Sequence, residues 1–219
     1  MKKLFFVMMC MMIYTFLNAQ SKKKSNGISF GVRAGVNLQN INGRDEFDNK
    51  QENKLVPRFH AGFNAELPLA DDFFVQPGVL FSTKGTKFKG SNTRLNLSYI
   101  EVPVNLLYKP ALGNGKLLLG FGPYLAFAVS GKLKPENGND RSITFKNEIS
   151  IGEALSGNFL RAFDAGGNLL VGYELSSNLS VQLNAQLGFV NIYPDIAGVA
   201  NNNRINKNTG FGLSLGYRF

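Results

Sequence analysis

Apolar and polar residues alternate along most of the chain with a period of two, which is typical of β-strands with two different faces. Several of these runs reach about ten residues or more, the length that a tilted membrane-spanning strand needs. No segment combines a helical period with helix caps, so we expect almost no helix. The eight runs cover residues 28–38, 59–67, 73–82, 100–108, 117–129, 163–175, 179–189 and 210–219.

The connections between these runs alternate in length. Long segments occupy 39–56, 85–93, 130–158 and 191–208, and short turns occupy 68–72, 110–115 and 176–178. An outer-membrane barrel with both termini in the periplasm has this order, because its periplasmic turns are short and its outer loops long. The sequence therefore predicts an all-β fold, an eight-stranded antiparallel up-and-down transmembrane β-barrel. A soluble lipocalin-like barrel stays open as an alternative, with the apolar faces lining a cavity.

Two features strain this pattern. Pro77, Pro103 and Pro123 lie inside predicted strands, although proline removes a ladder donor and usually marks an edge or a bulge. The apolar residues of segment 95–99 are also out of phase with the run that begins at Ile100. We expect local bulges or bends at these places, or else a sheet that stays open.

The N-terminal residues follow a different order. A positive head at Lys2–Lys3 precedes an apolar run over 4–17 and the small residue Ala19, which is the order of a secretory signal peptide. The run is shorter than the roughly 20 residues of a membrane-spanning helix. We expect a cleaved signal peptide at 1–19 and one outer-membrane β-barrel domain at 20–219.

The charge and cysteine content of the chain limit the classes of partner and chemistry that we expect. The formal net charge is +9, and loss of two lysines with the signal peptide leaves +7. An exported chain rarely meets nucleic acid, so we expect no nucleic-acid partner and regard anionic lipid or lipopolysaccharide phosphate as the counter-ion. The same lysines could instead only keep the loops solvated. Cys10 is the one cysteine, so the mature domain has no disulfide or thiol chemistry.

Ionisable residues on the polar faces point into the barrel if the apolar faces meet lipid. An interior charge needs a partner, because an unpaired one is strongly destabilising. Paired carboxylates can also do acid–base work, but in a narrow barrel we favour a network that locks the strands together. The predicted lumen polar network consists of Arg33, His60, Glu66, Glu101, Asp164, Glu174 and Arg218.

Other candidate chemistry is sparse. Residues 212–216 match the G-x-S-x-G pattern of serine hydrolases, but that pattern needs a strand-to-helix turn and a later histidine, and His60 precedes it. One histidine excludes a multi-histidine metal site, so we expect no metal and no cofactor. We assign no catalytic residue and expect no enzyme. A lipid-modifying enzyme that uses His60 and a nearby serine stays an alternative.

Two loops carry candidate binding surfaces. A basic cluster around the second predicted outer loop has no acidic residue among its members and is a candidate contact for anionic lipid phosphate. A solvated hairpin explains the same cluster. The long segment 130–158 balances its charges and is predicted to be an extracellular lid or a partner-binding surface. The basic cluster consists of Lys84, Lys87, Lys89 and Arg94.

Four segments carry a resemblance to a known family. The sequences GVRAGVN at 31–37, YIEVPV at 99–104, GFGPY at 120–124 and GYRF at 216–219 resemble the outer-membrane β-barrel domain family of Bacteroidota, often labelled porin-family or PorT-like. The resemblance covers the mature chain and marks a fold rather than an activity. It implies that Phe219 is the signal read by the barrel-assembly machinery. Known relatives include secretion-system components, which this sequence does not single out.

The patterns favour a non-enzymatic barrel in the bacterial outer membrane whose outer loops bind a surface partner or lipid. Its expected partners are outer-membrane lipid and lipopolysaccharide, the barrel-assembly machinery and, as a further option, other envelope proteins. A small-solute channel and a component of a secretion system stay alternatives. The word porin is not literal here, because eight strands leave an interior just wide enough for side chains.

Overall fold

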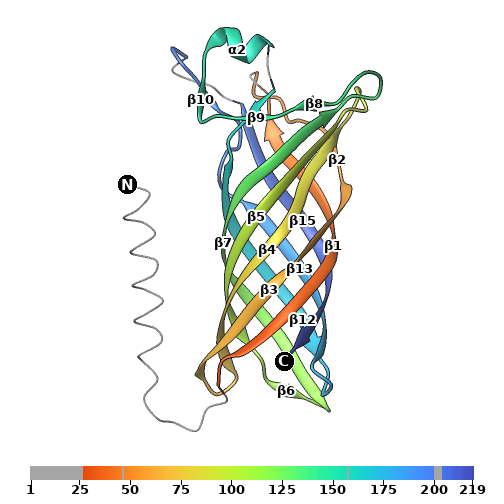
Figure 1. Cartoon of the computed structure of the whole chain (residues 1–219), viewed down its shortest axis with the longest axis vertical. Coiled ribbons are helices and arrows are strands. Elements are labelled where there is room, and N and C mark those ends of the chain that lie inside the picture. The colour runs from red at the N-terminus through yellow and green to blue at the C-terminus, as the bar shows by residue number, and fades with distance from the viewer. Residues whose placement is uncertain (1–26, 46, 157, 200–203) are drawn as a thin grey trace.

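The computed structural model describes residues 27–219 apart from 46, 157 and 200–203, so the expected signal peptide lies outside the described residues. Eight long strands wrap into one tilted cylinder (Figure 1). They are β1 (Ser29–Arg44), β3 (Val56–Ala70), β4 (Phe73–Phe88), β5 (Arg94–Tyr108), β7 (Gly115–Lys134), β12 (Phe163–Glu174), β13 (Leu179–Gly188) and β15 (Ile205–Arg218).

Each long strand pairs antiparallel with the next one along the chain, and β15 pairs back with β1. The closing ladder runs without interruption from the Gly31–Arg218 pair to the Arg44–Ile205 pair. Closure pairs every long strand on both sides, so this sheet has no free edge. The predicted eight-stranded antiparallel up-and-down barrel is therefore confirmed.

The outer wall is apolar and the interior is largely polar. Phe63, Phe121 and Leu215 stand out from the wall with more than half of their surface exposed, whereas alternate positions are buried. Large exposed apolar surfaces are unfavourable in water and mark a membrane or partner contact. Here they surround the cylinder, as lipid on all sides would require. The predicted orientation of the faces is thus confirmed.

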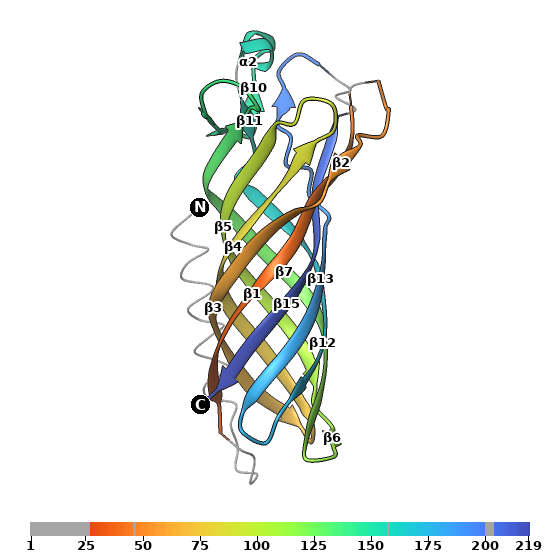
Figure 2. The same ribbon diagram turned by 90° about the vertical axis from the view of Figure 1, so that its right-hand side faces the viewer.

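The two ends of the cylinder differ (Figures 1 and 2). One end carries the short turns, where Asp72 and Asn178 adopt positive φ values of 63° and 65° that short polar side chains tolerate. We call it the short-turn end. It also holds the start of β1, the C-terminus and β6 (Ala111–Leu112), which pairs with β7.

The opposite end carries the long loops, and we call it the long-loop end. There β2 (Asn53–Lys54) pairs with β4 and β8 (Arg141–Ser142) with β7. Above the barrel mouth, one parallel bridge links the two longest loops and a second lies within the loop between β7 and β12, and we call this region the cap. It contains β9 (Thr144–Phe145) with β11 (Phe159–Leu160), β10 (Glu148–Ile149) with β14 (Asp195–Ile196), and the six-residue helix α2 (Ile151–Ser156). No helix in the described ranges has the length and apolarity to cross a membrane.

The expected irregularities turn out differently. The ladders keep one register past Pro77, Pro103 and Pro123, because each proline removes one donor and the neighbouring bonds hold the alignment. Segment 95–99 is not a slip within β5, since burial alternates along the whole strand. A register shift does occur beside Ser98 and Tyr99, but the additional residue lies in β7.

Candidate functional site

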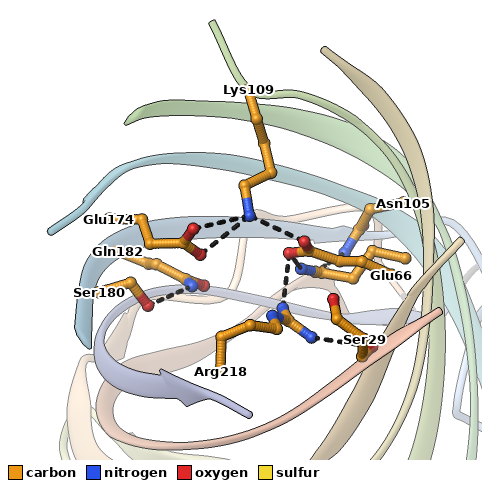
Figure 3. Close-up of polar contacts among 9 residues, drawn as sticks. Ser29, Glu66, Asn105, Lys109, Glu174, Ser180, Gln182 and Arg218 are labelled. Atoms are coloured by element: carbon orange, nitrogen blue, oxygen red, sulfur yellow. Dashed lines mark hydrogen bonds and ion pairs between the residues drawn. The ribbon is translucent and has the colours of Figure 1, made fainter. Parts of the chain in front are cut away.

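An ion cluster fills the interior at the short-turn end (Figure 3). Lys109 follows β5 directly and points across the barrel, with its Nζ 2.8 Å from Glu66 of β3 and 2.9 Å from Glu174 at the end of β12. Arg218 at the end of β15 donates a 2.6 Å hydrogen bond to the other oxygen of Glu66. These side chains come from β3, β12, β15 and the residue after β5, which are far apart in sequence, so the cluster links distant parts of the barrel wall. We call it the lower ion cluster.

Amide side chains continue this cluster toward the middle of the barrel. Gln76 donates to Glu66 at 3.2 Å, Asn105 donates to Gln76 at 3.5 Å, and Asn168 donates to Asn105 at 3.0 Å. Gln182 donates to Ser180 on the opposite wall at 3.0 Å (Figure 3). Interior polar groups with such partners stabilise a unique packing, whereas unpaired ones would oppose it.

A second ion cluster, the upper ion cluster, lies closer to the long-loop end. Lys84 of β4 places its Nζ 3.1 Å from Glu101 of β5 and 3.2 Å from Asp164 of β12, and its side chain is 1% exposed. Tyr124 donates to Asp164 at 3.3 Å, and the Lys84 ammonium lies 4.1 Å from the centre of the Tyr124 ring. Asn208 of β15 also donates to Asp164, at 2.9 Å. The ammonium is thus held by carboxylates and by an aromatic face.

His60 joins two residues that the sequence alone does not bring together. Its Nδ1 lies 2.8 Å from Oδ1 of Asn37, and its Nε2 lies 2.8 Å from Oγ of Ser214, the serine of the G-x-S-x-G match. A hydroxyl, an imidazole and an orienting amide form the arrangement of a nucleophilic triad. Ser214 is fully buried, however, and the adjoining cavity of about 20 Å³ has room for one water molecule and none for a lipid acyl group.

The interior charges balance. Four cations, Arg33, Lys84, Lys109 and Arg218, accompany four carboxylates, Glu66, Glu101, Asp164 and Glu174. Arg33 makes no ion contact as short as the lysines make, but it lines the same small cavity as Glu101. Because charges in a low-dielectric interior need compensation, this equality lets six buried and two largely buried ionisable groups stay together in the lumen.

The structure places every residue of the predicted lumen network inside the barrel. Five of them form two clusters around Lys84 and Lys109, which the predicted network lacks, whereas His60 contacts Asn37 and Ser214 and Arg33 lines the small cavity. Lys109 lies one residue past the end of the predicted strand 100–108, outside the alternating pattern that selects inward residues. Lys84 corrects a prediction: it cannot contact lipid, because β4 extends to Phe88 and Lys84 continues the inward face. Lys87 and Arg94 lie outside the barrel, and Lys89 pairs with Glu52.

Apolar side chains fill the interior above the upper ion cluster. Leu97 and Tyr99 of β5 point inward there and pack with Ile41 of β1. Leu160 and Ile192 come from the two longest loops and join the same core. The cap is therefore anchored to the barrel by a hydrophobic plug, and burial of apolar area of this kind stabilises by about 25 cal/mol per Å².

The structure is similar to several solved outer-membrane proteins. Neisserial surface protein A is 14% identical, with 89% of this chain and 100% of that chain covered and a TM-score of 0.46. Ail, the attachment invasion locus protein of Yersinia pestis, is 12% identical over the same shares with a TM-score of 0.43. OprG from Pseudomonas aeruginosa is 13% identical, with 88% and 96% covered and a TM-score of 0.46.

No curated protein matches the sequence. The family described as "Outer membrane protein beta-barrel domain" matches residues 18–193, which include seven of the eight long strands. This match agrees with the closed antiparallel sheet, the apolar outer wall and the charged interior. The chain therefore belongs to the outer membrane protein beta-barrel domain family of the bacterial outer membrane.

Proposed function

We propose that the protein is a solute-tight outer-membrane anchor that holds its cap at the cell surface, where the cap binds a surface partner or lipid. In this proposal both termini lie in the periplasm and the long-loop end faces outward. The single observation that carries it is the filled interior. A barrel whose interior is occupied at every level offers a rigid support rather than a passage.

The filling has three layers. The lower ion cluster spans the interior at Lys109, the upper ion cluster spans it at Lys84, and the hydrophobic plug closes the mouth around Tyr99. All three side chains are buried. A cavity of about 20 Å³ beside His60 has room for one water molecule, which is far less than a passing solute requires. These features support the anchor over the small-solute channel.

The cap supports an interaction role. Arg161 and Asp195 form a 2.5 Å ion pair between the two longest loops, and the parallel bridge between β10 and β14 joins the same loops. On α2, Ile151 and Leu155 lie one helical turn apart, and Leu155 is 87% exposed. A fixed surface with protruding apolar side chains is suited to binding a partner without prior ordering of its backbone.

Two finer assignments belong to the same proposal. The resemblance of segments 31–37 and 99–104 to Bacteroidota barrels supports placing the chain among PorT-like small barrels. Phe219 is proposed as the assembly signal. Its backbone N–H donates to Phe30 at 2.8 Å, and its ring projects from the outer wall beside Tyr217 with 5.3 Å between ring centres. An exposed terminal aromatic ring is accessible to an assembly factor.

Single cysteines test the orientation, since Cys10 in the expected signal peptide is the one native cysteine. Asn137→Cys lies in the loop after β7, and the matched control Ser177→Cys lies in the turn between β12 and β13. We expect a membrane-impermeant maleimide to label position 137 on intact cells, and position 177 only after the outer membrane is opened. The reverse pattern would overturn the orientation.

Planar-bilayer recordings test the closed interior. The wild-type protein should produce no conductance steps, because the interior is filled across its width. Stepwise conductance from the folded, heat-shiftable protein would replace the anchor with a channel. The unaltered protein is used, so no substitution can create an artificial leak.

A further inference from the structure

Four cationic residues form one row across the wall of the barrel at its long-loop end. Lys54 of β2 lies opposite Lys87 of β4, and Lys87 lies opposite Arg94 of β5. Arg94 in turn lies opposite Lys134 of β7. Directly opposed residues of an antiparallel pair share a face, with their Cβ atoms about 4.5–5.5 Å apart. We call these residues the cationic row.

The cationic row faces outward. The residue next to Lys87 is Phe88, and the residue next to Arg94 is Leu95; both pack into the hydrophobic plug. Side chains alternate along a strand, so their neighbours point away from the interior. Lys54, Arg94 and Lys134 are exposed, in agreement with this direction. The row is therefore part of the outer wall and not of the lumen.

Little negative charge compensates the row. Lys134 has a 3.3 Å contact with Asp140, whose side chain is 46% exposed. Within the described residues, Lys54, Lys87 and Arg94 form no salt bridge with a carboxylate. Like charges placed directly opposite each other destabilise a sheet. Repulsion within these three successive cation pairs thus destabilises the free protein, and a bound external anion would reduce that repulsion.

The position of the row indicates which anion it meets. Outward residues change along the wall from apolar at the Phe81–Ile100 pair to hydroxyl-bearing at the Thr83–Ser98 pair, and then to cationic in the row. The row begins six residues beyond Ile100, which is about 20 Å along a strand. Long cationic side chains can also reach back toward the membrane from there. The wall thus follows the order of an outer-leaflet glycolipid, from acyl chains to headgroup phosphates.

We propose that the cationic row binds the phosphate groups of lipopolysaccharide in the outer leaflet. The inference rests on the proposed function, because the long-loop end must face outward for the row to meet this lipid. Arg94 sits near the centre of the row and offers a planar guanidinium for bidentate contact with phosphate, while the lysines on either side supply flexible charges. Bound phosphate would relieve the repulsion between the opposed cations.

Binding of two lipids in detergent tests the proposal. The probes are diphosphorylated lipid A and the same lipid after enzymatic removal of its phosphates, each titrated into the folded protein and counted by native mass spectrometry. We expect the wild-type protein to bind the phosphorylated form about tenfold more tightly, and 0.5 M salt to remove most of this preference, because salt screens exposed charges.

A matched pair of double variants locates the site. K87Q/R94Q removes two neighbouring charges of the row, whereas K50Q/K207Q removes two long-loop-end charges beside β1, outside the row. We expect about a tenfold loss of phosphorylated lipid A affinity in the first variant and less than a twofold loss in the second. Equal losses in both variants, or equal wild-type affinity for both lipids, would overturn the proposal.

Folding and orientation are controlled separately. Each variant is first checked for heat-dependent gel mobility, and if K87Q/R94Q does not fold, the wild-type comparison of the two lipids at low and high salt decides. Binding in detergent is independent of how the barrel sits in a membrane and of whether it conducts. A failed lipid test therefore leaves the anchor standing, and a failed labelling test leaves the lipid affinity intact.

Discussion

Lys84→Met removes the one ammonium group of the upper ion cluster while keeping a side chain of similar length. Its Nζ lies 3.1 Å from Glu101 and 3.2 Å from Asp164, and all three side chains are buried. Coulomb's law with an effective dielectric constant near 20 gives about 5 kcal/mol for each contact. Methionine avoids the desolvation penalty of the buried ammonium, and this gain offsets part of the lost Coulomb energy. We therefore expect the free energy of unfolding to fall by about 3–5 kcal/mol.

Urea unfolding of the protein in lipid vesicles measures this loss, with the heat-shifted gel band reporting the folded fraction. Lys89→Met is the matched control, because Lys89 pairs with Glu52 on the surface and should lose less than about 1 kcal/mol. The triple variant K84M/E101Q/D164N removes the two stranded charges along with the ammonium. It should recover about half of the loss or more, since neutral amides are less costly to bury.

Two results would refute this reasoning. If K84M loses no more stability than K89M, the buried ion contacts contribute no more than an exposed pair. If the triple variant is as unstable as K84M, the loss comes from packing around the Tyr124 ring and not from unpaired carboxylates. In either case the upper ion cluster would not be the part of the lumen that secures the closed barrel.

Three further outcomes are expected. Ser214→Ala should lower the unfolding free energy by about 1–3 kcal/mol, because it removes a hydrogen-bond partner of His60. It should leave the phospholipid and lipid A profiles of the cell unchanged; a changed profile would support the alternative of a lipid-modifying enzyme. Gly35→Val should block folding in a heat-shift assay, since a Cβ there would lie 2.2 Å from a backbone oxygen of the neighbouring strand. Hydrogen bonds from Lys146 and a backbone amide hold the pKa of Glu153 below its usual range, so these contacts stabilise the cap above the ordinary glutamate pKa and are lost as the pH falls through the lowered value. Hydrogen-exchange protection of 148–156 should fall on acidification in the wild-type protein, and less in E153Q; equal pH dependence in the two would contradict the assignment.

The alternating pattern predicts most of the fold, because each membrane-spanning strand repeats the same alternation of outward apolar and inward polar residues over many positions. Predicted strands end early at the long-loop end, where β4 reaches Phe88 and β7 reaches Lys134. There the rule changes, since the outer wall becomes polar above the lipid and the interior becomes apolar within the plug. Leu97 and Tyr99 look out of phase for this reason, although β5 alternates without interruption.

Lys84 and Lys109 are absent from the predicted lumen network, but the net charge of that network indicates that cations are lacking. The predicted lumen network contains four carboxylates and two arginines, an excess of negative charge that a buried interior does not tolerate. Lys84 lies in phase with the polar face of its strand, and Lys109 lies in phase with Glu101 and one residue past the predicted strand end. A requirement for neutrality would have selected both.

The contact between His60 and Ser214 could not be predicted in this way. The two residues are 154 positions apart, and their strands flank β1 on opposite sides. Gly35 of β1 lies opposite both of them in the two ladders, and its missing side chain lets the imidazole reach the hydroxyl. The contact thus depends on two registers at once, and register is set by the assembled sheet rather than by any one strand.

The same arrangement of large and small residues explains why the interior can be filled at all. Arg33 lies opposite Gly62 on one side and opposite Gly216 on the other, so its long side chain occupies space that two neighbours leave free. Eight strands enclose too little volume for large residues at every inward position. A slip by one residue would turn the inward charges toward lipid and the outward apolar residues toward the lumen. Closure of the sheet, its register and the filling of the interior by side chains therefore depend on the same ladders.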